Sequence, residues 1–290
     1  MIKDRLGNVI AKNSGQSRSL EWLYNTRFGR FLLSKLIIKR FSDMGYSFMS
    51  SRLSKPRIKK TIKKNSIDMT EYEEKQYSSF NDFFTRRIKD GARVIEKNRD
   101  SVIAPADSKL TVYDVNEDSV YRIKGCDYSI KTLLGDEERA KEFYGGKCFV
   151  YRLSVDNYHR YCYVDDCVED EFYKIDGVYH TVNPIALEHY DVYGKNCREI
   201  TYISTENFGR TAYIEVGAMM VGKINNEHKE GRQKKGEEKG YFSFGGSTII
   251  ILYRKDTVLP DDDILKNSRE EIETVVKYGE KVGVSCKIEE

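Results

Sequence analysis

The spacing of apolar residues changes near residue 100 and divides the chain into two parts. Between residues 19 and 50, apolar residues recur at helical spacing, with charged residues between them. The apolar face that this spacing predicts contains Phe28, Phe31, Leu32, Leu36 and Ile37. A second helical pattern, in residues 70–90, is built on Tyr72, Tyr77, Phe80, Phe83 and Phe84. Residues 1–18 are polar, and we expect them to be loose.

Beyond residue 100 the pattern becomes one of short β-rich runs separated by turn signals. These runs are residues 111–115, 148–153, 199–204, 211–216 and 248–253. We expect residues 226–240, rich in Lys, Glu and Gly, to form a mobile loop, and residues 268–278 to form a helix. The predicted fold is α+β, with an N-terminal helical region (1–95) followed by a β-rich domain (96–290) of mainly antiparallel strands.

The composition indicates a soluble globular protein. Hydrophobic residues make up 39% and charged residues 33% of the 290 positions, which argues against a disordered chain. The net charge of +3 is too small to indicate a nucleic-acid partner. Positive charge is concentrated in residues 55–64. This segment is either a solvated face or a surface attracted to anionic lipid, at about 1 kcal/mol per Lys or Arg.

The helical pattern of residues 19–50 also has two interpretations. An ordinary helix would pack its apolar face on the core, whereas an interfacial helix would bury that face among lipid headgroups. A membrane-spanning helix needs about 20 mainly apolar residues. The best N-terminal candidate, residues 31–38, is short and interrupted by Lys35. Any membrane contact is therefore expected to be peripheral.

The six cysteines give no sign of a metal site. None forms a CxxC pair, and the spacing of Cys162 and Cys167 matches no common set of zinc ligands. The first residues lack the apolar run of a secretory signal. We therefore expect reduced thiols and no bound metal.

The segment Gly245-Gly246-Ser247-Thr248 is the strongest candidate for chemistry. Glycine reaches backbone conformations that other residues avoid, so a strained Gly246–Ser247 peptide would allow the Ser247 hydroxyl to attack the preceding carbonyl. A hydrophobic run follows at residues 249–252. Taken alone, the same four residues are also typical of a β-turn or a phosphate-binding loop.

Seven further segments change that interpretation, because with them the chain resembles the phosphatidylserine decarboxylase family over most of its length. They occur in the family's order and lead to Gly245–Thr248. The segments are residues 80–86 (FNDFFTR), 104–107 (APAD), 128–135 (YSIKTLLG), 156–160 (DNYHR), 205–209 (TENFG), 216–222 (VGAMMVG) and 236–240 (GEEKG). Residues 24–30 (YNTRFGR) are also similar to some bacterial members.

The resemblance implies a self-processing proenzyme that depends on a pyruvoyl group. In the family, the serine of the glycine-serine pair forms an ester with the preceding carbonyl, and elimination and hydrolysis convert this serine to the pyruvoyl group. Cleavage between Gly246 and Ser247 would produce a β chain of residues 1–246 and an α chain of residues 247–290, which would stay associated. The pyruvoyl carbonyl would form a Schiff base with the substrate amine and accept electrons during decarboxylation, as pyridoxal phosphate does elsewhere.

Two further catalytic residues follow from the resemblance. Asp107 is similar to the family's charge-relay aspartate, which would orient a histidine that activates Ser247. Its structural alternative is a turn cap after Pro105. His159 matches a catalytic histidine of the family. Its structural alternative is a packed histidine before an aromatic strand.

The chain departs from the family three positions after His159. Many members carry a second histidine there, often assigned as the base for self-cleavage, but this chain has Cys162. Three candidates for the base are open: His159 for both steps, Cys162, whose thiol is a weak base near neutral pH, or His180 folding back as a replacement. We favour His180, which predicts that His180→Ala stays uncut while Cys162→Ala is still processed.

The resemblance thus predicts a decarboxylase that converts phosphatidylserine to phosphatidylethanolamine and carbon dioxide. The expected partner is phosphatidylserine in an anionic leaflet, and the expected location is the cytoplasmic face of the cell membrane, with peripheral attachment through residues 1–95. A homodimer is a further expectation. Two alternatives are a decarboxylase of a soluble amino acid on the same scaffold and a non-catalytic β-rich binding module.

Overall fold

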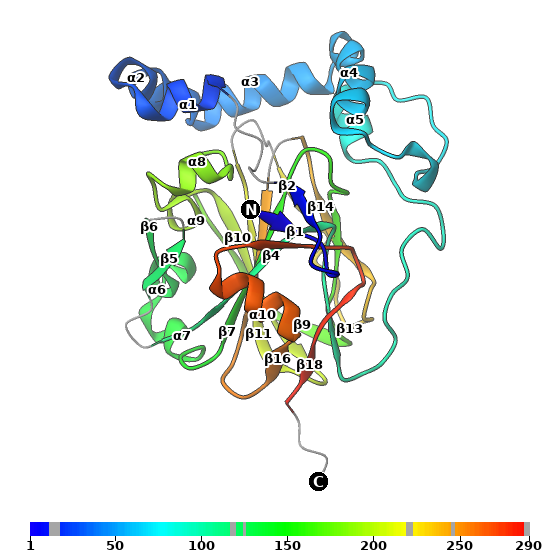
Figure 1. Ribbon diagram of the computed structural model, residues 1–290, viewed down its shortest axis with the longest axis vertical. Helices are drawn as coiled ribbons and strands as arrows, with labels where there is room; N and C mark the ends of the chain where they lie inside the picture. The colour runs from blue at the N-terminus through cyan, green and yellow to red at the C-terminus, as the bar shows by residue number, and fades with distance from the viewer. Residues whose placement is uncertain (12–17, 117–119, 124–125, 219–222, 245–246, 287–290) are drawn as a thin grey trace.

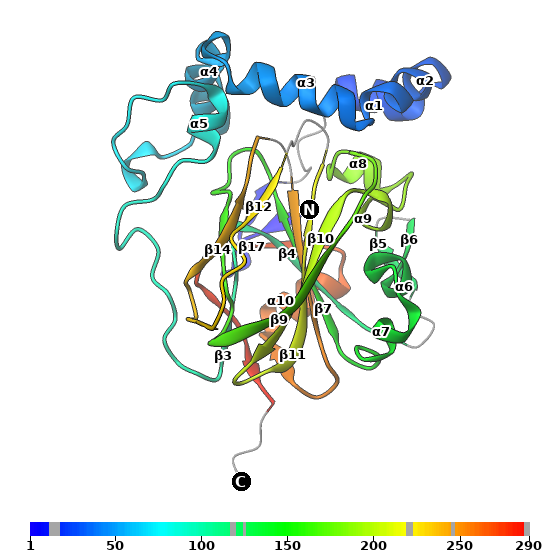
Figure 2. The ribbon, with the colours of Figure 1, turned by 180° about the vertical axis from the view of Figure 1, so that it is seen from behind.

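The protein has a layer of helices lying across one end of a β-rich body (Figures 1 and 2). The computed structural model describes residues 1–11, 18–116, 120–123, 126–218, 223–244 and 247–286. Its strands pair antiparallel, apart from one parallel pair between β1 and β17. The α+β prediction is confirmed.

The helical layer confirms the helices expected between residues 19 and 50. The pattern is divided into three helices, α1 (Arg18–Asn25), α2 (Arg27–Leu36) and α3 (Lys39–Ser50). Thr26 begins α2, since its hydroxyl accepts a hydrogen bond from the Gly29 backbone N–H. Leu33 is buried, whereas Phe28 and Phe31 are 68% and 63% exposed.

The basic segment forms a helix, α4 (Pro56–Asn65), which Pro56 starts at a position where proline is well tolerated. The prediction of a helix over residues 70–90 is wrong. Only a short 3₁₀ turn, Met69–Glu71, and α5 (Phe80–Phe84) form there. Tyr77, Phe80, Phe83 and Phe84 pack in one cluster with Met49 of α3 and Phe244, whereas Tyr72 belongs to a different cluster.

In the described part of the chain, the main sheet of the body has ten strands and contains all five expected β-rich runs. Its order is β13 (Arg232–Gln233), β9 (Cys167–Ile175), β10 (Arg198–Thr205), β11 (Gly209–Val216), β15 (Ser247–Tyr253), β7 (Lys147–Leu153), β4 (Ser108–Asp114), β17 (Glu273–Val276), β1 (Ile2–Lys3) and β2 (Val9–Ala11).

Among the residues that the structure describes, three smaller sheets and several short helices complete the body. The small sheets are β12 (Ile224–Asn226) with β14 (Glu238–Phe242) and β8 (Arg160–Cys162), β16 (Val258–Pro260) with β18 (Lys281–Ser285) and β3 (Ser101–Ile103), and β5 (Val120–Ile123) with β6 (Cys126–Ser129). The helices are α6 (Ile130–Leu134), α7 (Glu137–Lys141), α8 (Pro184–Leu187), α9 (Val192–Lys195) and α10 (Asp262–Arg269).

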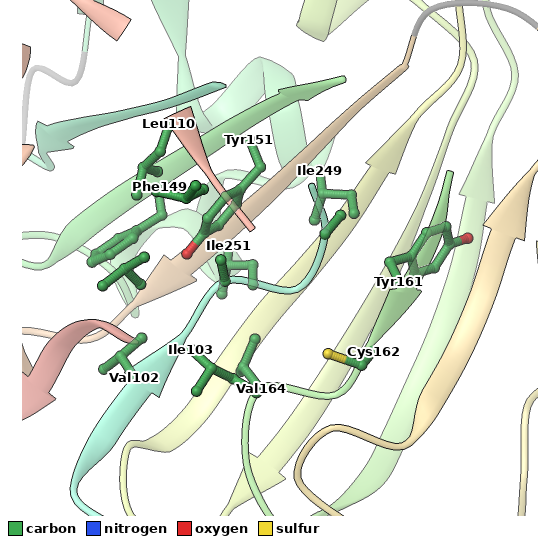
Figure 3. Close-up of a cluster of buried hydrophobic side chains, with 14 of the residues drawn as sticks. Val102, Ile103, Leu110, Phe149, Tyr151, Tyr161, Cys162, Val164, Ile249 and Ile251 are labelled. Carbon is green, nitrogen blue, oxygen red and sulfur yellow. The ribbon is translucent and has the colours of Figure 1, made fainter. Parts of the chain in front are cut away.

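The central strand β15 is buried along its whole length because both faces of the sheet are covered. Successive side chains of a strand point to opposite faces. Ile249 and Ile251 therefore enter one core cluster, shown in part in Figure 3, together with Cys162. Ile250 enters a second cluster on the other face, together with Tyr24 of α1. Ser247 has the same parity as Ile249 and belongs to the first face.

Three local expectations are wrong. Ile2–Lys3 and Val9–Ala11 form strands at the edge of the main sheet instead of loose chain. Residues 226–240 contain β13 and the start of β14. The helix expected at 268–278 lies earlier, as α10, and is followed by β17, which pairs with β4.

Candidate active site

Ser247 is the first residue of β15 and is fully buried. It is paired in register with Leu153, the last residue of β7, so its position is set by a central strand of the main sheet. Gly246, the other residue of the predicted cleavage site, lies outside the described residues. The side chain of Ser247 faces the cluster that contains Ile249 and Cys162.

The structure brings Ser247 together with His159. The Ser247 Oγ and the His159 Nδ1 are 3.5 Å apart, at the long end of a hydrogen bond. The other ring nitrogen of His159, Nε2, lies 3.0 Å from the backbone carbonyl oxygen of Ser154. Since a carbonyl oxygen only accepts, Nε2 carries the hydrogen, and in the neutral ring Nδ1 keeps the lone pair that faces the serine.

The environment keeps this imidazole neutral. Burial lowers the pKa of His159 to about 3, and the nearby positive charge of Arg86 acts in the same direction. The ring is stacked on Phe84, with 3.9 Å between ring centroids and 28° between the ring planes. His159 therefore has the tautomer, the charge state and the orientation that a general base for Ser247 requires.

The segment around Phe84 also holds the chain just before the predicted cleavage site. The Asn81 side-chain oxygen accepts a hydrogen bond of 2.8 Å from the Phe244 backbone N–H. The Phe244 ring packs edge-on against Phe80 and Phe84, at 4.9 Å and 5.4 Å between centroids. One turn of helix, α5, thus contacts both the histidine and the approach to Ser247.

Two arginines fix the relative position of α5 and the histidine segment. The Arg86 Nη2 donates to the backbone carbonyls of Asp156 and Asn157, at 3.2 Å and 3.3 Å. Arg160 donates to the Thr85 carbonyl at 3.1 Å from both Nε and Nη2. These hydrogen bonds join two segments that are far apart in the sequence. Residues 80–86 and residues 156–160 are therefore held in a fixed position relative to each other.

Asp107 lies in a different group of contacts. Its carboxylate accepts hydrogen bonds from the Arg93 Nε and Nη2, at 2.9 Å and 2.6 Å, and from the Tyr278 backbone N–H at 2.9 Å. Arg93 also pairs with Glu71. Among the contacts described for Asp107, none reaches His159 or Ser247. The charge-relay role of Asp107 stays a prediction.

The contacts described for Cys162 lead toward this aspartate and do not include Ser247. Its thiol is buried and interacts with the Tyr278 hydroxyl, while the Tyr278 backbone binds Asp107. Burial raises the pKa of the Cys162 thiol to about 12. A thiol with this pKa holds its proton at neutral pH and is a poor base.

His180 is buried on the other side of the main sheet. Its Nδ1 lies 3.2 Å from the Tyr24 hydroxyl, and its ring is stacked on Tyr190 at 4.5 Å between centroids. Its backbone N–H donates to the Asn196 side chain at 2.9 Å. Burial lowers the pKa of His180 to about 4. The contacts described for His180 do not include Ser247, and its role as the base stays a prediction.

Known proteins are similar to this chain in sequence over nearly its whole length. The profile of the family described as phosphatidylserine decarboxylase matches residues 80–284. The chain belongs to this family. It is 46% identical over 279 residues to phosphatidylserine decarboxylase proenzyme 2 of Clostridium acetobutylicum, covering 96% of each chain. It is 40% identical over 281 residues to a phosphatidylserine decarboxylase proenzyme of Clostridium botulinum, covering 95% of each chain.

Within the family's scaffold, the structure adds site residues that sequence reasoning missed. Phe84 was expected only as an apolar helix position, and Ser154 was not considered. The role of Ser154 depends on its backbone carbonyl, which leaves no signal in the residue type. Phe84 belongs to the segment 80–86, so its position in a matched segment was a signal, although its contact with His159 was not predictable.

Proposed function

We propose that the protein is a self-processing, pyruvoyl-dependent decarboxylase that converts phosphatidylserine to phosphatidylethanolamine and carbon dioxide. One observation carries the proposal: the buried Ser247 hydroxyl faces the unprotonated Nδ1 of His159 at 3.5 Å. The names of the relatives support the substrate and the proenzyme form.

Self-cleavage would begin when His159 Nδ1 takes the proton of the Ser247 hydroxyl. The Ser247 Oγ forms a bond to the carbonyl carbon of Gly246, and the bond from that carbon to the Ser247 nitrogen breaks. The nitrogen takes up a proton, so an ester replaces the peptide bond. Removal of the proton on the Ser247 α-carbon then expels the Gly246 carboxylate from the β-carbon and leaves a carbon–carbon double bond, as dehydroalanine. Its imine form adds water and releases ammonia, so the α chain keeps a pyruvoyl N-terminus.

The residues around Ser247 suit such a group. When formed, the pyruvoyl group supplies a carbonyl that accepts the electrons left after loss of carbon dioxide. Ser247 is fully buried, and the neighbouring residues on its face of β15 are apolar, so the site excludes bulk water. His159 would remain beside the group after cleavage, held by Phe84 and the Ser154 carbonyl.

The helical layer supports access to a lipid substrate from an anionic membrane surface. Phe28 and Phe31 of α2 are largely exposed, beside the exposed Arg27 and Arg30. The exposed basic residues of α4 are Arg57, Lys59, Lys60, Lys63 and Lys64. In the described part of the chain, every helix is too short or too polar to cross a bilayer. We therefore propose peripheral attachment through this layer to the cytoplasmic face of the cell membrane.

The two chains would remain associated after cleavage. Residues of the α chain form β15, which is paired on one side with β11 and on the other with β7. Further along, β17 pairs with β4 and β18 pairs with β3. On its other side, β17 pairs with β1. In the described part of the chain, the α chain is thus held by five strands of the β chain, and its separation would require unfolding of the main sheet.

Mass measurement of the purified protein tests self-processing. We expect two chains, residues 1–246 and 247–290, with the smaller one blocked at its N-terminus by the pyruvoyl group. The Ser247→Ala variant should remain a single chain. A wild-type protein that stays at 33.7 kDa after long incubation would contradict the proposal.

The substrate is tested separately with the processed protein. We expect release of carbon dioxide from liposomes that contain phosphatidylserine, and none from liposomes of phosphatidylcholine alone. Free serine and free aromatic amino acids serve as controls. Release from a free amino acid, but not from the lipid, would favour a decarboxylase of soluble substrates on the same scaffold.

A further inference from the structure

Lys109 is a partly buried lysine close to the proposed base. It follows Asp107 by two residues, on β4, and is paired in register with Arg152 of β7. The Lys109 ammonium group donates a hydrogen bond to the Ser154 hydroxyl. The ion pairs of the described residues assign it no carboxylate, whereas its neighbour Arg152 is matched by Glu273 through two hydrogen bonds of 2.6 Å.

The lysine is costly to keep in this position. Burial lowers the pKa of Lys109, and the positive charge of Arg152 lowers it further, while Asp156 and Glu273 act in the opposite direction. A methionine of similar length could fill the same space without losing hydration of a charge. A buried charge without a direct ion-pair partner is therefore a candidate for a functional role.

The contacts of Ser154 connect the lysine to the histidine. The Ser154 hydroxyl, which accepts from Lys109, lies 2.9 Å from the Asn157 side-chain oxygen, to which the Ser154 backbone N–H also donates. The Ser154 carbonyl closes the same turn by accepting from the Asn157 backbone N–H at 2.9 Å. That carbonyl also accepts from the His159 Nε2.

We propose that Lys109 is a positioning residue for self-cleavage: it fixes the Ser154–Asn157 turn, whose carbonyl holds the His159 tautomer that leaves Nδ1 facing Ser247. This inference rests on the proposed function. The lysine acts on His159 through two successive hydrogen bonds, one from Lys109 to the Ser154 hydroxyl and one from His159 Nε2 to the Ser154 carbonyl. None of its described hydrogen bonds reaches the reacting atoms. Its positive charge has a second effect, because together with Arg86 it opposes protonation of His159.

The test compares the rate at which the full-length proenzyme becomes two chains, measured on gels over time for each variant. Lys109→Met should slow cleavage about tenfold, since it removes a hydrogen bond from a charged donor. Lys109→Arg should recover most of the rate. Lys147→Met is the matched control, because Lys147 lies on β7 and forms a surface ion pair with Asp114. This variant should be cleaved at the wild-type rate.

The pH profile separates positioning from a merely structural role. The base must be neutral, so the cleavage rate falls as pH drops through the pKa of His159. Because the Lys109 charge lowers this pKa, Lys109→Met should move the acid limb of the profile to higher pH. Lys109→Arg and Ser154→Ala both keep a positive charge there, so their acid limbs should stay near that of the wild type.

A double-mutant cycle tests whether Lys109 and Ser154 act together. Ser154→Ala keeps the carbonyl but removes the hydroxyl, and should also slow cleavage. Lys109→Met/Ser154→Ala should be no slower than Lys109→Met, because both changes break the same connection. Should Lys109→Met fail to fold, the rate and pH profile of Lys109→Arg and Ser154→Ala still decide the matter.

The inference would be overturned if Lys109→Met were cleaved at the wild-type rate with an unchanged acid limb. It would also be overturned if the double variant were slowed by the product of the two single-variant factors. Normal cleavage of Ser154→Ala would also overturn it. These outcomes can be distinguished from those that would refute the proposed function. In that case the wild-type protein would remain one chain, or Ser247→Ala would still be cut.

Discussion

Two buried histidines, His159 and His180, lie on opposite faces of the main sheet and differ in what their ring nitrogens contact. Burial lowers the pKa of both, to about 3 and about 4. His159 has one nitrogen on a backbone carbonyl and the other facing Ser247. The Nδ1 of His180 faces the Tyr24 hydroxyl of α1. A neutral, buried imidazole is therefore not enough to indicate a base.

The difference follows from the alternation of side chains along β15. Ser247 points to the same face as Ile249, where the segment carrying His159 packs. His180 contacts Tyr24 and Tyr190, which belong to or pack against the cluster on the other face. Burial raises the pKa of the Tyr24 hydroxyl well above its ordinary value, so this hydroxyl keeps its proton where it lies against the Nδ1 of His180. The geometry favours His159 as the base and assigns His180 a contact between the helical layer and the body.

Replacing each histidine should give the largest contrast between the two faces. His159→Ala should remain uncut, with a loss of at least about a hundredfold in rate, because a general base contributes about 10²–10⁴. His180→Ala should still be processed. Gel mobility over a time course decides between them. Cleavage of His159→Ala together with an uncut His180→Ala would instead support the prediction made from the sequence.

The aromatic residue that stacks on each histidine provides the next contrast. Phe84→Leu should slow cleavage about tenfold, since the ring of His159 loses the surface that orients it, and a small misplacement of a base is costly. Tyr190→Leu removes the corresponding contact of His180 and should leave the cleavage rate unchanged. Thermal unfolding of both variants is the control for folding. Equal cleavage rates would indicate that stacking has no part in the mechanism.

Sequence reasoning predicted the strand that begins at Ser247 and proposed Ser247 and His159 as site residues, because a glycine pair before a hydrophobic run and a set of matched segments are properties of the chain itself. The structure forms this strand and brings the two side chains together. It could not determine which face of the sheet each histidine occupies. The segment carrying His180 has no pattern that reveals its partner, and Tyr24 lies 156 residues away. The sequence therefore could not show whether His180 lies near Ser247, and its role as the base stays a prediction.

The error near the C-terminus has a local cause that the sequence did contain. Ile272, Val275 and Val276 suggested a helix, but Thr274, Val275 and Val276 are consecutive β-branched residues, which favour a strand. The helix α10 begins earlier, after Asp261, with Asp262 and Asp263 in its first turn, where negative charge is favourable. Start signals of this kind should have outweighed apolar spacing.

The pH dependence of stability sharpens the comparison, because both histidines should destabilise the proenzyme in acid. A histidine with a lowered pKa in the folded state binds fewer protons there than in the unfolded chain. Its contribution to stability is complete above about pH 6.5 and is lost as pH falls toward its folded pKa, by at most about 1.4 kcal/mol per pH unit. Urea unfolding of Ser247→Ala, which avoids cleavage, should show this fall between pH 6.5 and 4.

The contribution of His180 can be isolated by adding His180→Gln to Ser247→Ala. The glutamine does not titrate in this range, so the free energy of unfolding should depend less steeply on pH. The effect of His159→Gln should extend to lower pH, because the pKa of His159 is lower. The free energy of unfolding could instead depend on pH in the same way in all three proteins. The pKa values of the two histidines would then not differ between the folded and unfolded states, which would contradict this prediction.

The smallest expected effect is that of Tyr24→Phe, which removes the hydroxyl between α1 and the body. This hydroxyl contacts His180 Nδ1 at 3.2 Å and accepts from the Thr181 backbone N–H at 3.3 Å. Its loss should lower the free energy of unfolding by about 1 kcal/mol, as is usual for one hydrogen-bonding group. The rate of self-cleavage should not change, because the contact lies on the face of the sheet away from Ser247. Slower cleavage at unchanged stability would show that the helical layer communicates with the reactive serine and that the two faces are not independent.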